Sequence, residues 1–402
     1  FRRPSERSRA CEEDSHGWEQ VLCRPGGISV AAAQLRQLGQ SKSLSEGKLL
    51  HSLLRTRGID RLTFIGNCLI EMYANCGCPH DARIAFCRLP DPNVFSWNML
   101  IKAYAQNNHV QNAFHVFCST PLRDSVTWNA MISAFARHGL GSQALHLFYQ
   151  MKEEGFVQDK ISFIGALDAC ILLRPVNIHL GRDIHAEVVG FGFEQNVLVS
   201  TAVLNMYGKC GNLGDAKIVF EQLLNRDVAM WNAIIGLFAR AGNKKDALFK
   251  FGQMLKCGFS PDHVSFISVL EACALDEGQI VHAAVLDSSY ELDAEVSTAI
   301  FSMYGKHGSL WHATYVFNRM PFKSLVVWNA MIAVFSQNNR SKDALRLYKQ
   351  MHLEGLKPDK STYTTLLDAC ANLASIEEGQ DVYRAVVCHQ HDEDILLCNS
   401  LI

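Results

Sequence analysis

Apolar residues recur three and four positions apart along most of this chain, the spacing that places them on one face of an α-helix. Residues 125–159 show two such stripes in succession. The first consists of Trp128, Met131, Ile132 and Phe135, and the second of Ala144, Leu147, Phe148 and Met151. Between them HGLGS interrupts the period, Ser142 is a candidate N-cap, and Gly155 is a candidate helix stop. The segment is therefore predicted to form two helices joined by a short turn.

The same two-helix unit recurs along the chain. We predict borders at 28–62, 63–93, 94–124, 125–159, 160–196, 197–227, 228–262, 263–293, 294–324, 325–359 and 360–394, with a twelfth unit begun at 395. The units have 31, 35 or 37 residues. Three sequence types cycle: one with WNAMI, a long type with LDAC or LEAC followed by GRDIH, GQIVH or GKLLH, and one with MYGKCG or a relative of it. One such unit cannot bury both its faces, so stacking predicts an all-α fold, a right-handed α-solenoid with a continuous core and a concave face.

Composition and charge exclude several classes of protein. With 48% hydrophobic and 19% charged residues, the 402-residue chain has the make-up of a folded soluble protein. The formal net charge is −2, so charge alone does not indicate a nucleic-acid ligand, and any basic surface must be local. Fourteen cysteines without a CxxC pair predict small buried side chains in a reducing compartment. No apolar run is long enough to predict a membrane span.

The two ends of the chain differ from the middle. Residues 1–27 begin with the Arg- and Ser-rich FRRPSERSRA and are predicted to be an unstructured leader, with the remnant of a targeting segment as an alternative. The array is predicted to occupy 28–402. Because the chain starts at Phe1 and ends inside a helical pattern at NSLI, we expect it to be cut at both ends.

Eleven units in one register, with this cycle of three types, resemble the pentatricopeptide repeat family. The cycle resembles the P-L-S subclass found in plant organelle RNA-processing proteins. The resemblance covers residues 28–402 and implies a protein of the mitochondrion or chloroplast that binds single-stranded RNA.

Two places of each unit are the candidate base readers. The fifth place holds Asn67, Asn98, Asn129, Thr201, Asn232, Thr298, Asn329 and Asn399. The last place of the same units holds Asn93, Asp124, Asp159, Asp227, Asp262, Ser324 and Asp359. The fifth place lies off the apolar stripe, and the family geometry implies that both places face the concave groove. A carboxamide can match a base edge as donor and acceptor, whereas an ionised aspartate only accepts.

Helix capping is the competing interpretation, because Asn, Thr and Asp are common residues at helix starts. Four units repeat the combination of Asn and Asp at matched places, which capping does not require: 98/124, 129/159, 232/262 and 329/359. Repeats of this family read one base each with two or three side chains. We therefore predict base recognition by these pairs.

The family code, carried over pair by pair, implies a target sequence. Asn with Asp implies U, Thr with Asp implies G, Asn67 with Asn93 implies a pyrimidine, and Thr298 with Ser324 implies a purine. The long units hold Ile164, Ile267 and Thr364 at the fifth place and are expected to space the RNA. The expected target is 5′-YUUNGUNRUN-3′.

Two further places bear on affinity. The second residue of a unit is expected to pack on the base plane, as Phe64, Phe95, Val126, Leu198 and Val326 can, whereas Ala229 and Glu295 fit poorly. Cations one to two turns further along are expected to meet phosphates, with ordinary solvated surface residues as the alternative: Arg137, Lys209, Arg240 and Lys306. So sparse a line of cations predicts a modest salt dependence of binding.

Other polar clusters do not indicate chemistry. NCGCPH brings Cys76, Cys78 and His80 together, but without the usual zinc-ligand spacing, so no metal site is predicted. His51, His185 and His282 recur in the GxxxH segments and are expected to be structural. No phosphate loop, nucleophile elbow or HExxH motif occurs, so we expect no enzyme activity in this chain and no cofactor.

The family implies a specific task, site recognition for C-to-U editing of organelle transcripts, by a monomer that acts with other RNA-editing proteins. Two alternatives stay open. One is a tetratricopeptide-like protein scaffold, which the lack of a steady 34-residue unit disfavours. The other is the recognition arm of a deaminase or nuclease, whose HxE…CxxC or acidic catalytic domain is absent from this chain.

Overall fold

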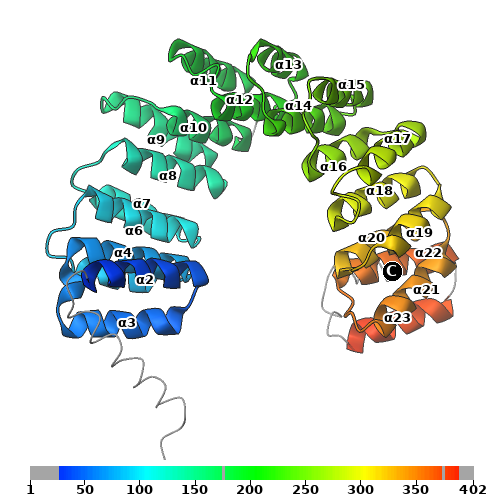
Figure 1. The fold of residues 1–402 in the computed structure, drawn as a ribbon, viewed down its shortest axis with the longest axis horizontal. Helices are drawn as coiled ribbons and strands as arrows, with labels where there is room; N and C mark the ends of the chain where they lie inside the picture. The colour runs from blue at the N-terminus through cyan, green and yellow to red at the C-terminus, as the bar shows by residue number, and fades with distance from the viewer. Residues whose placement is uncertain (1–26, 174–176, 374–375, 389–402) are drawn as a thin grey trace, which may run out of the picture. The chain divides into compact units, whose positions relative to one another are not determined.

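In the computed structural model the protein is built of short helices (Figure 1). The structure describes residues 27–173, 177–373 and 376–388. Within these ranges it contains 22 α-helices, one 3-10 helix and no strand. An all-α architecture is therefore confirmed, while the predicted leader up to residue 26 and Asn399 lie outside the described residues.

The chain divides into two compact units, Phe1–Cys210 and Gly211–Ile402. The first holds α2 (Gly27–Ser41), α3 (Leu44–Thr56), η1 (Ile59–Arg61), α4 (Thr63–Asn75), α5 (Pro79–Cys87), α6 (Val94–Gln106), α7 (Val110–Ser119), α8 (Ser125–Arg137), α9 (Gly141–Glu153), α10 (Lys160–Leu172), α11 (Ile178–Gly190) and α12 (Val197–Lys209). The second holds α13 (Leu213–Gln222), α14 (Val228–Arg240), α15 (Lys244–Lys256), α16 (His263–Ala272), α17 (Leu275–Leu286), α18 (Ala294–Lys306), α19 (Leu310–Arg319), α20 (Leu325–Gln337), α21 (Ser341–Leu353), α22 (Lys360–Leu373) and α23 (Ile376–Cys388).

The repeat borders coincide with helix starts. From residue 63 to residue 360, the first residue of every expected repeat is the first residue of an even-numbered helix, here called an A helix. The odd-numbered helix that follows is the B helix of that repeat. Only the first repeat differs, because α2 begins one residue early, at Gly27. The two-helix repeat is thus present throughout the described chain.

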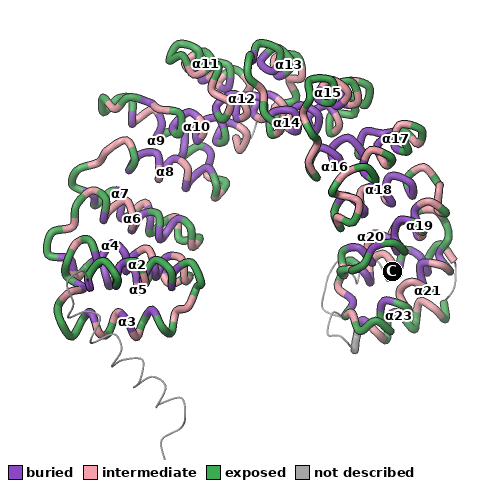
Figure 2. The backbone as a smooth tube through the Cα atoms, in the orientation of Figure 1, coloured by how far each residue is buried: buried purple, intermediate pink, exposed green. Residues whose placement is uncertain are grey.

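Successive A helices pack on one another inside each compact unit, from α2 to α12 and from α14 to α22. Buried residues line these contacts, whereas the B helices carry much of the exposed surface (Figure 2). Three tryptophans of the WN segments, Trp128, Trp231 and Trp328, belong to this core, whereas Trp97 is half-buried. Trp128 is fully buried and meets Phe117 of the preceding B helix edge-on, with ring centroids 5.0 Å apart. Such edge-to-face pairs add to the free energy of burial.

The turn between α8 and α9 needs a residue in the left-handed region, which Gly139 supplies with φ 76°. Two other repeats carry Asn at the matching place, Asn108 with φ 63° and Asn339 with φ 56°. The residue before Asn108 fastens the turn to the preceding repeat, because Asn107 Nδ2 donates to the Ala74 carbonyl at 2.9 Å.

None of the described helices combines the length and apolar character that a bilayer crossing needs.

Candidate nucleic-acid interface

The predicted asparagine–aspartate partners contact each other. In each pair the asparagine Nδ2 donates to the carboxylate at the end of the same repeat. The distances are 3.2 Å for Asn98 to Asp124, 3.0 and 2.9 Å for Asn129 to Asp159, 2.9 and 3.1 Å for Asn232 to Asp262, and 3.0 Å for Asn329 to Asp359. Because a carboxylate only accepts, it orients each amide with its nitrogen toward the aspartate.

The same aspartates also cap the next A helix. Asp124 is the N-cap of α8 and accepts from the Thr127 backbone N–H at 2.8 Å. Asp262 caps α16 in the same way, through Ser265 at 2.9 Å. Capping and pairing are therefore not alternatives here, because one carboxylate does both.

These contacts lower the pKa of three of the aspartates. Burial by itself would raise the pKa of Asp262, but the hydrogen bonds from Ser265 and Asn232 outweigh burial and hold that pKa below its ordinary value. The same balance lowers the pKa of Asp124 and of Asp359. The carboxylates of Asp124, Asp262 and Asp359 are thus held in the ionised form.

The fifth-place asparagines are more deeply buried than the sequence interpretation of a groove-facing side chain suggests. Asn129 is 4% exposed and Asn67 is 8% exposed. Pairing alone does not explain the burial, because Asn67 is buried without an aspartate partner, whereas the paired Asn98 and Asn329 are half-buried. Among the described residues, the buried Oδ1 atoms of Asn67, Asn98 and Asn129 have no hydrogen-bond partner. Those of Asn232 and Asn329 accept from Ser265 at 2.5 Å and from Thr362 at 2.7 Å.

The Asn67 and Asn93 pair has a different arrangement. Asn93 caps α6 through the Ser96 backbone N–H at 3.0 Å. Asn67 and Asn93 line a hollow of about 380 Å³ together with Phe64 and Phe95. The fifth and last places therefore share one cavity with the second places of two successive repeats.

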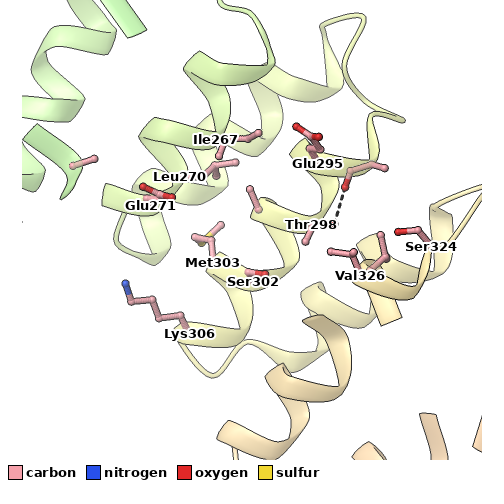
Figure 3. Close-up of a pocket in the computed structure, with 14 residues that line it drawn as sticks. Ile267, Leu270, Glu271, Glu295, Thr298, Ser302, Met303, Lys306, Ser324 and Val326 are labelled. Carbon is pink, nitrogen blue, oxygen red and sulfur yellow. Dashed lines mark hydrogen bonds between the residues drawn. The ribbon is translucent and has the colours of Figure 1, made fainter. Parts of the chain in front are cut away.

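Thr298 and Ser324 also line one hollow, of about 880 Å³, on the A helices α16, α18 and α20 (Figure 3). Thr298 Oγ1 donates to the Ala294 carbonyl at 2.6 Å, the dashed line in the figure. Glu295 and Val326, the second places of two successive repeats, border this hollow.

Thr201 belongs to the first compact unit and Asp227 to the second, so their pairing stays a prediction.

The apolar second-place residues are exposed although they are large. Those predicted from the sequence are Phe64, Phe95, Val126, Leu198 and Val326, and all are at least half exposed. The sequence interpretation missed Ile161 and Val264, which occupy the same place in two long repeats and are also exposed. An alignment of the long repeats with the other repeats places both residues at the second position and could have identified them. Ala229 and Glu295 are exposed without an apolar surface to offer.

The predicted cations Arg137, Lys209, Arg240 and Lys306 are all exposed at the C-terminal ends of A helices. Lys306 lines the larger hollow together with Glu271, an acid that the sequence interpretation did not single out (Figure 3). Asp168 stands at the matching place of another long repeat. Burial raises the pKa of Asp168, and the charge of Lys209 opposes that shift. Acids of the long repeats therefore lie near cations of the repeats that follow them.

The recurrent histidines have a structural partner. Nδ1 of each lies within hydrogen-bond distance of a tyrosine hydroxyl on the next A helix: 2.7 Å for His51 and Tyr73, and 3.0 Å both for His185 and Tyr207 and for His282 and Tyr304. In the described part of the chain, no three His, Cys, Asp or Glu side chains gather as a metal site would require, and Cys76, Cys78 and His80 form no such group.

Comparison with known proteins gives one consistent family. The model described as "PPR repeat" matches residues 95–119, 126–156, 199–228 and 296–325, "PPR repeat family" matches 323–372, and "Pentatricopeptide repeat domain" matches 224–275. A mitochondrial pentatricopeptide repeat-containing protein of Arabidopsis thaliana is 35% identical over 247 residues, 61% of this chain and 41% of the relative. A chloroplastic one is 31% identical over 370 residues, 92% of this chain and 42% of the relative. The chain thus spans less than half the length of these relatives.

The crystal structure of the pentatricopeptide repeat protein PPR10 from maize has the same fold. It is 18% identical, with a TM-score of 0.58, over 98% of this chain and 64% of that one. This match confirms the α-solenoid. The mitochondrial and chloroplastic names of the relatives bear out the predicted organellar location.

Proposed function

Because the chain belongs to the pentatricopeptide repeat family, we propose that it binds single-stranded RNA in a sequence-specific manner. Each repeat outside the long type contacts one base. The observation that carries this proposal is the set of four asparagine–aspartate pairs, joined at 2.9 to 3.2 Å. Modules of this family read one base per helical repeat through two or three side chains.

The chemistry of the paired amide favours a base with an N–H donor. The aspartate holds the amide nitrogen, which leaves the amide oxygen as the acceptor. In Asn98 and Asn129 this oxygen is buried without a partner among the described residues. An unsatisfied buried acceptor is costly, and a donor from a ligand relieves that cost. Uracil carries such a donor at N3, in agreement with the U that the family code assigns to these pairs.

The exposed second places supply the apolar contact that an unstacked base needs. Phe64 and Phe95 border the hollow that holds Asn67, so a base there meets an aromatic face beside its polar reader. Stacking on aromatic side chains contributes about 1–3 kcal/mol per base. Ile164 and Ile267 offer no hydrogen bond at the fifth place, so these long repeats act as spacers in this proposal. The proposed target is 5′-YUUNGUNRUN-3′.

The biological task proposed for the chain is site recognition for C-to-U editing of organelle transcripts. The three-type cycle, which resembles the P-L-S subclass, and the organellar relatives support it. In this proposal the chain acts as a monomer that selects the site, together with other RNA-editing proteins. The chemical step belongs to a domain or partner beyond these repeats.

A binding titration tests the proposal. The chain is titrated at fixed salt into 5′-YUUNGUNRUN-3′ RNA, a composition-matched scramble, and the target with its G replaced by A. We expect the target to bind at least about tenfold more tightly than the scramble, since each mismatched base costs about 1–3 kcal/mol. Asp227→Asn is expected to turn the preference at that nucleotide from G to A.

Asp246→Asn, a half-buried site on the B helix α15, serves as the matched control and should leave the preference at G. Equal binding of target and scramble, or no binding of either, would overturn base reading. The protein-scaffold alternative would then be the better interpretation.

A further inference from the structure

The third residue of each A helix varies together with the fifth residue of the repeat before it. After every fifth-place asparagine, the next repeat carries a hydroxyl at its third place: Ser96, Thr127, Ser162, Ser265 and Thr362. After every other fifth-place residue the third place is apolar: Ile65, Val199, Met230, Val296, Val327 and Leu397. The match holds in all eleven successive cases within this one chain.

Helix capping does not explain this match. The hydroxyl lies at the N3 position and does join the capping box of α8, α10 and α16. Yet Asp227 caps α14 with Met230 at N3, and Asp293 caps α18 with Val296 at N3. A cap aspartate therefore works without the hydroxyl. What distinguishes the repeats that carry the hydroxyl is the asparagine that precedes them.

The contacts show what the hydroxyl does. Ser265 Oγ lies 2.5 Å from Asn232 Oδ1 and 3.0 Å from Asp262 Oδ1. Thr362 Oγ1 has the same two neighbours, at 2.7 Å from Asn329 Oδ1 and 2.9 Å from Asp359 Oδ1. The hydroxyl thus stands between the amide oxygen and the carboxylate, with one hydrogen to donate.

In the other asparagine repeats the hydroxyl has turned away from the amide. Thr127 Oγ1 lies 2.7 Å from Asp124 Oδ1, and Ser162 Oγ lies 2.7 Å from the Asp159 carbonyl oxygen. The amide oxygens of Asn98 and Asn129 are then left buried without a partner among the described residues. The same side-chain set therefore occurs in two states, one with the amide oxygen satisfied and one with it open.

We infer that the third-place hydroxyl is a positioning residue for the base reader of the preceding repeat. It satisfies the buried amide oxygen while no base is bound, and it swings to the aspartate when a base N–H takes its place. Ser265 and Thr362 are 0% exposed whereas Asn232 is 9% exposed, so a base reaches the asparagine and not the hydroxyl. It acts through the asparagine, by holding the amide oxygen while the carboxylate holds the amide nitrogen. This inference rests on the proposed RNA binding.

The test measures base preference at one nucleotide. Asn232 is assigned to the sixth nucleotide of the target, so RNAs with U or C at that position are titrated against the wild type and Ser265→Ala. Cytosine presents an acceptor where uracil presents N3–H, so a loosely held amide discriminates less between them. In Ser265→Ala we expect the Kd for the C-containing RNA divided by the Kd for the U-containing RNA to fall about fivefold relative to the wild type. This is the effect of losing one hydrogen bond. The corresponding ratio at the second nucleotide, assigned to Asn98, should not change.

Two further variants separate positioning from fold. Ser265→Thr keeps the hydroxyl and should restore the wild-type ratio. Asn212→Ala removes a cap of α13, where Asn212 accepts from the Asp215 backbone N–H at 3.1 Å, and it should lower stability without changing the ratio. Urea unfolding verifies that each variant is folded.

The outcomes are distinct. A local fall of the ratio at the sixth nucleotide, restored by threonine, supports the inference. If the wild type discriminates U from C and Ser265→Ala discriminates equally well, the positioning role is wrong while RNA reading stands. If the wild type binds target and scramble alike, the proposed function fails, and this inference fails with it.

Discussion

Burying an asparagine requires polar partners for its amide, since an unpaired amide in the core costs several kcal/mol. Asn129 meets this requirement for its amide nitrogen through Asp159, which accepts at 3.0 and 2.9 Å, while its amide oxygen has no partner among the described residues. The neighbouring Trp128 fills the core against Phe117. The WN dipeptide therefore combines a packing residue with an amide of fixed orientation. An amide held in one orientation is better suited to discriminating bases than a mobile surface side chain.

The aspartates make folding sensitive to acid. The pKa of Asp262 is lowered in the folded chain from its ordinary value of 3.8, so the unfolded chain takes up a proton first as the pH falls. The stabilisation is present above the ordinary value and is lost as the pH drops through the folded pKa. We expect the free energy of unfolding in urea to decline from about pH 5 downward, and to decline less steeply for Asp262→Asn. Equal slopes for variant and wild type would contradict the role of this carboxylate.

The GxxxH segment of the long repeats is a contact between neighbouring repeats. Its histidine reaches a tyrosine on the next A helix, as His282 reaches Tyr304 at 3.0 Å. Its glycine makes room for the methionine before that tyrosine, because a Cβ on Gly278 would lie 2.4 Å from Met303 Sδ. The GxxxH of one repeat and the MY of the next therefore form one interface. The same set recurs at Gly47 and Gly181.

Gly278→Ala tests this interface. The added methyl group overlaps the end of the Met303 side chain, and overpacking costs about 1–3 kcal/mol of unfolding free energy. The higher helix propensity of alanine offsets up to about 1 kcal/mol of that cost, so we expect a net loss of stability. Gly252→Ala is the matched control, because no atom lies within 4 Å of its Cβ position in α15. The control should gain up to about 1 kcal/mol, since alanine is the better helix former. Equal stability of both variants in urea unfolding would show that the glycine is not required for packing.

At the scale of the whole chain, the repeat period predicted the helices well because each repeat buries the same stripe. Ten successive A helices, from α4 to α22, begin where the aligned sequence placed a repeat border. The period did not show how deeply Asn129 is buried, since that depends on the next repeat closing over it. It also did not single out Ser265, whose covariation is visible in the sequence but whose partner is known only from the 2.5 Å contact.

The charge of the whole chain leads to a last prediction. With a formal net charge of −2, RNA affinity depends on local cations, and the A helices end in four exposed ones: Arg137, Lys209, Arg240 and Lys306. For single strands the logarithm of affinity falls by about 0.7 for each phosphate contact per unit of log salt, so four contacts give a slope of about −3.

Replacing two of these cations, as Arg137→Gln with Arg240→Gln, should make that slope shallower by about 1.4. The base preferences should not change, because phosphate contacts carry no sequence information. Arg346→Gln, an exposed site on the B helix α21 paired with Asp343, is the control and should leave the slope as it is. The measurement is the Kd for the target RNA between about 50 and 200 mM salt. If the double variant and the control gave the same slope, the RNA backbone would run elsewhere than along these helix ends.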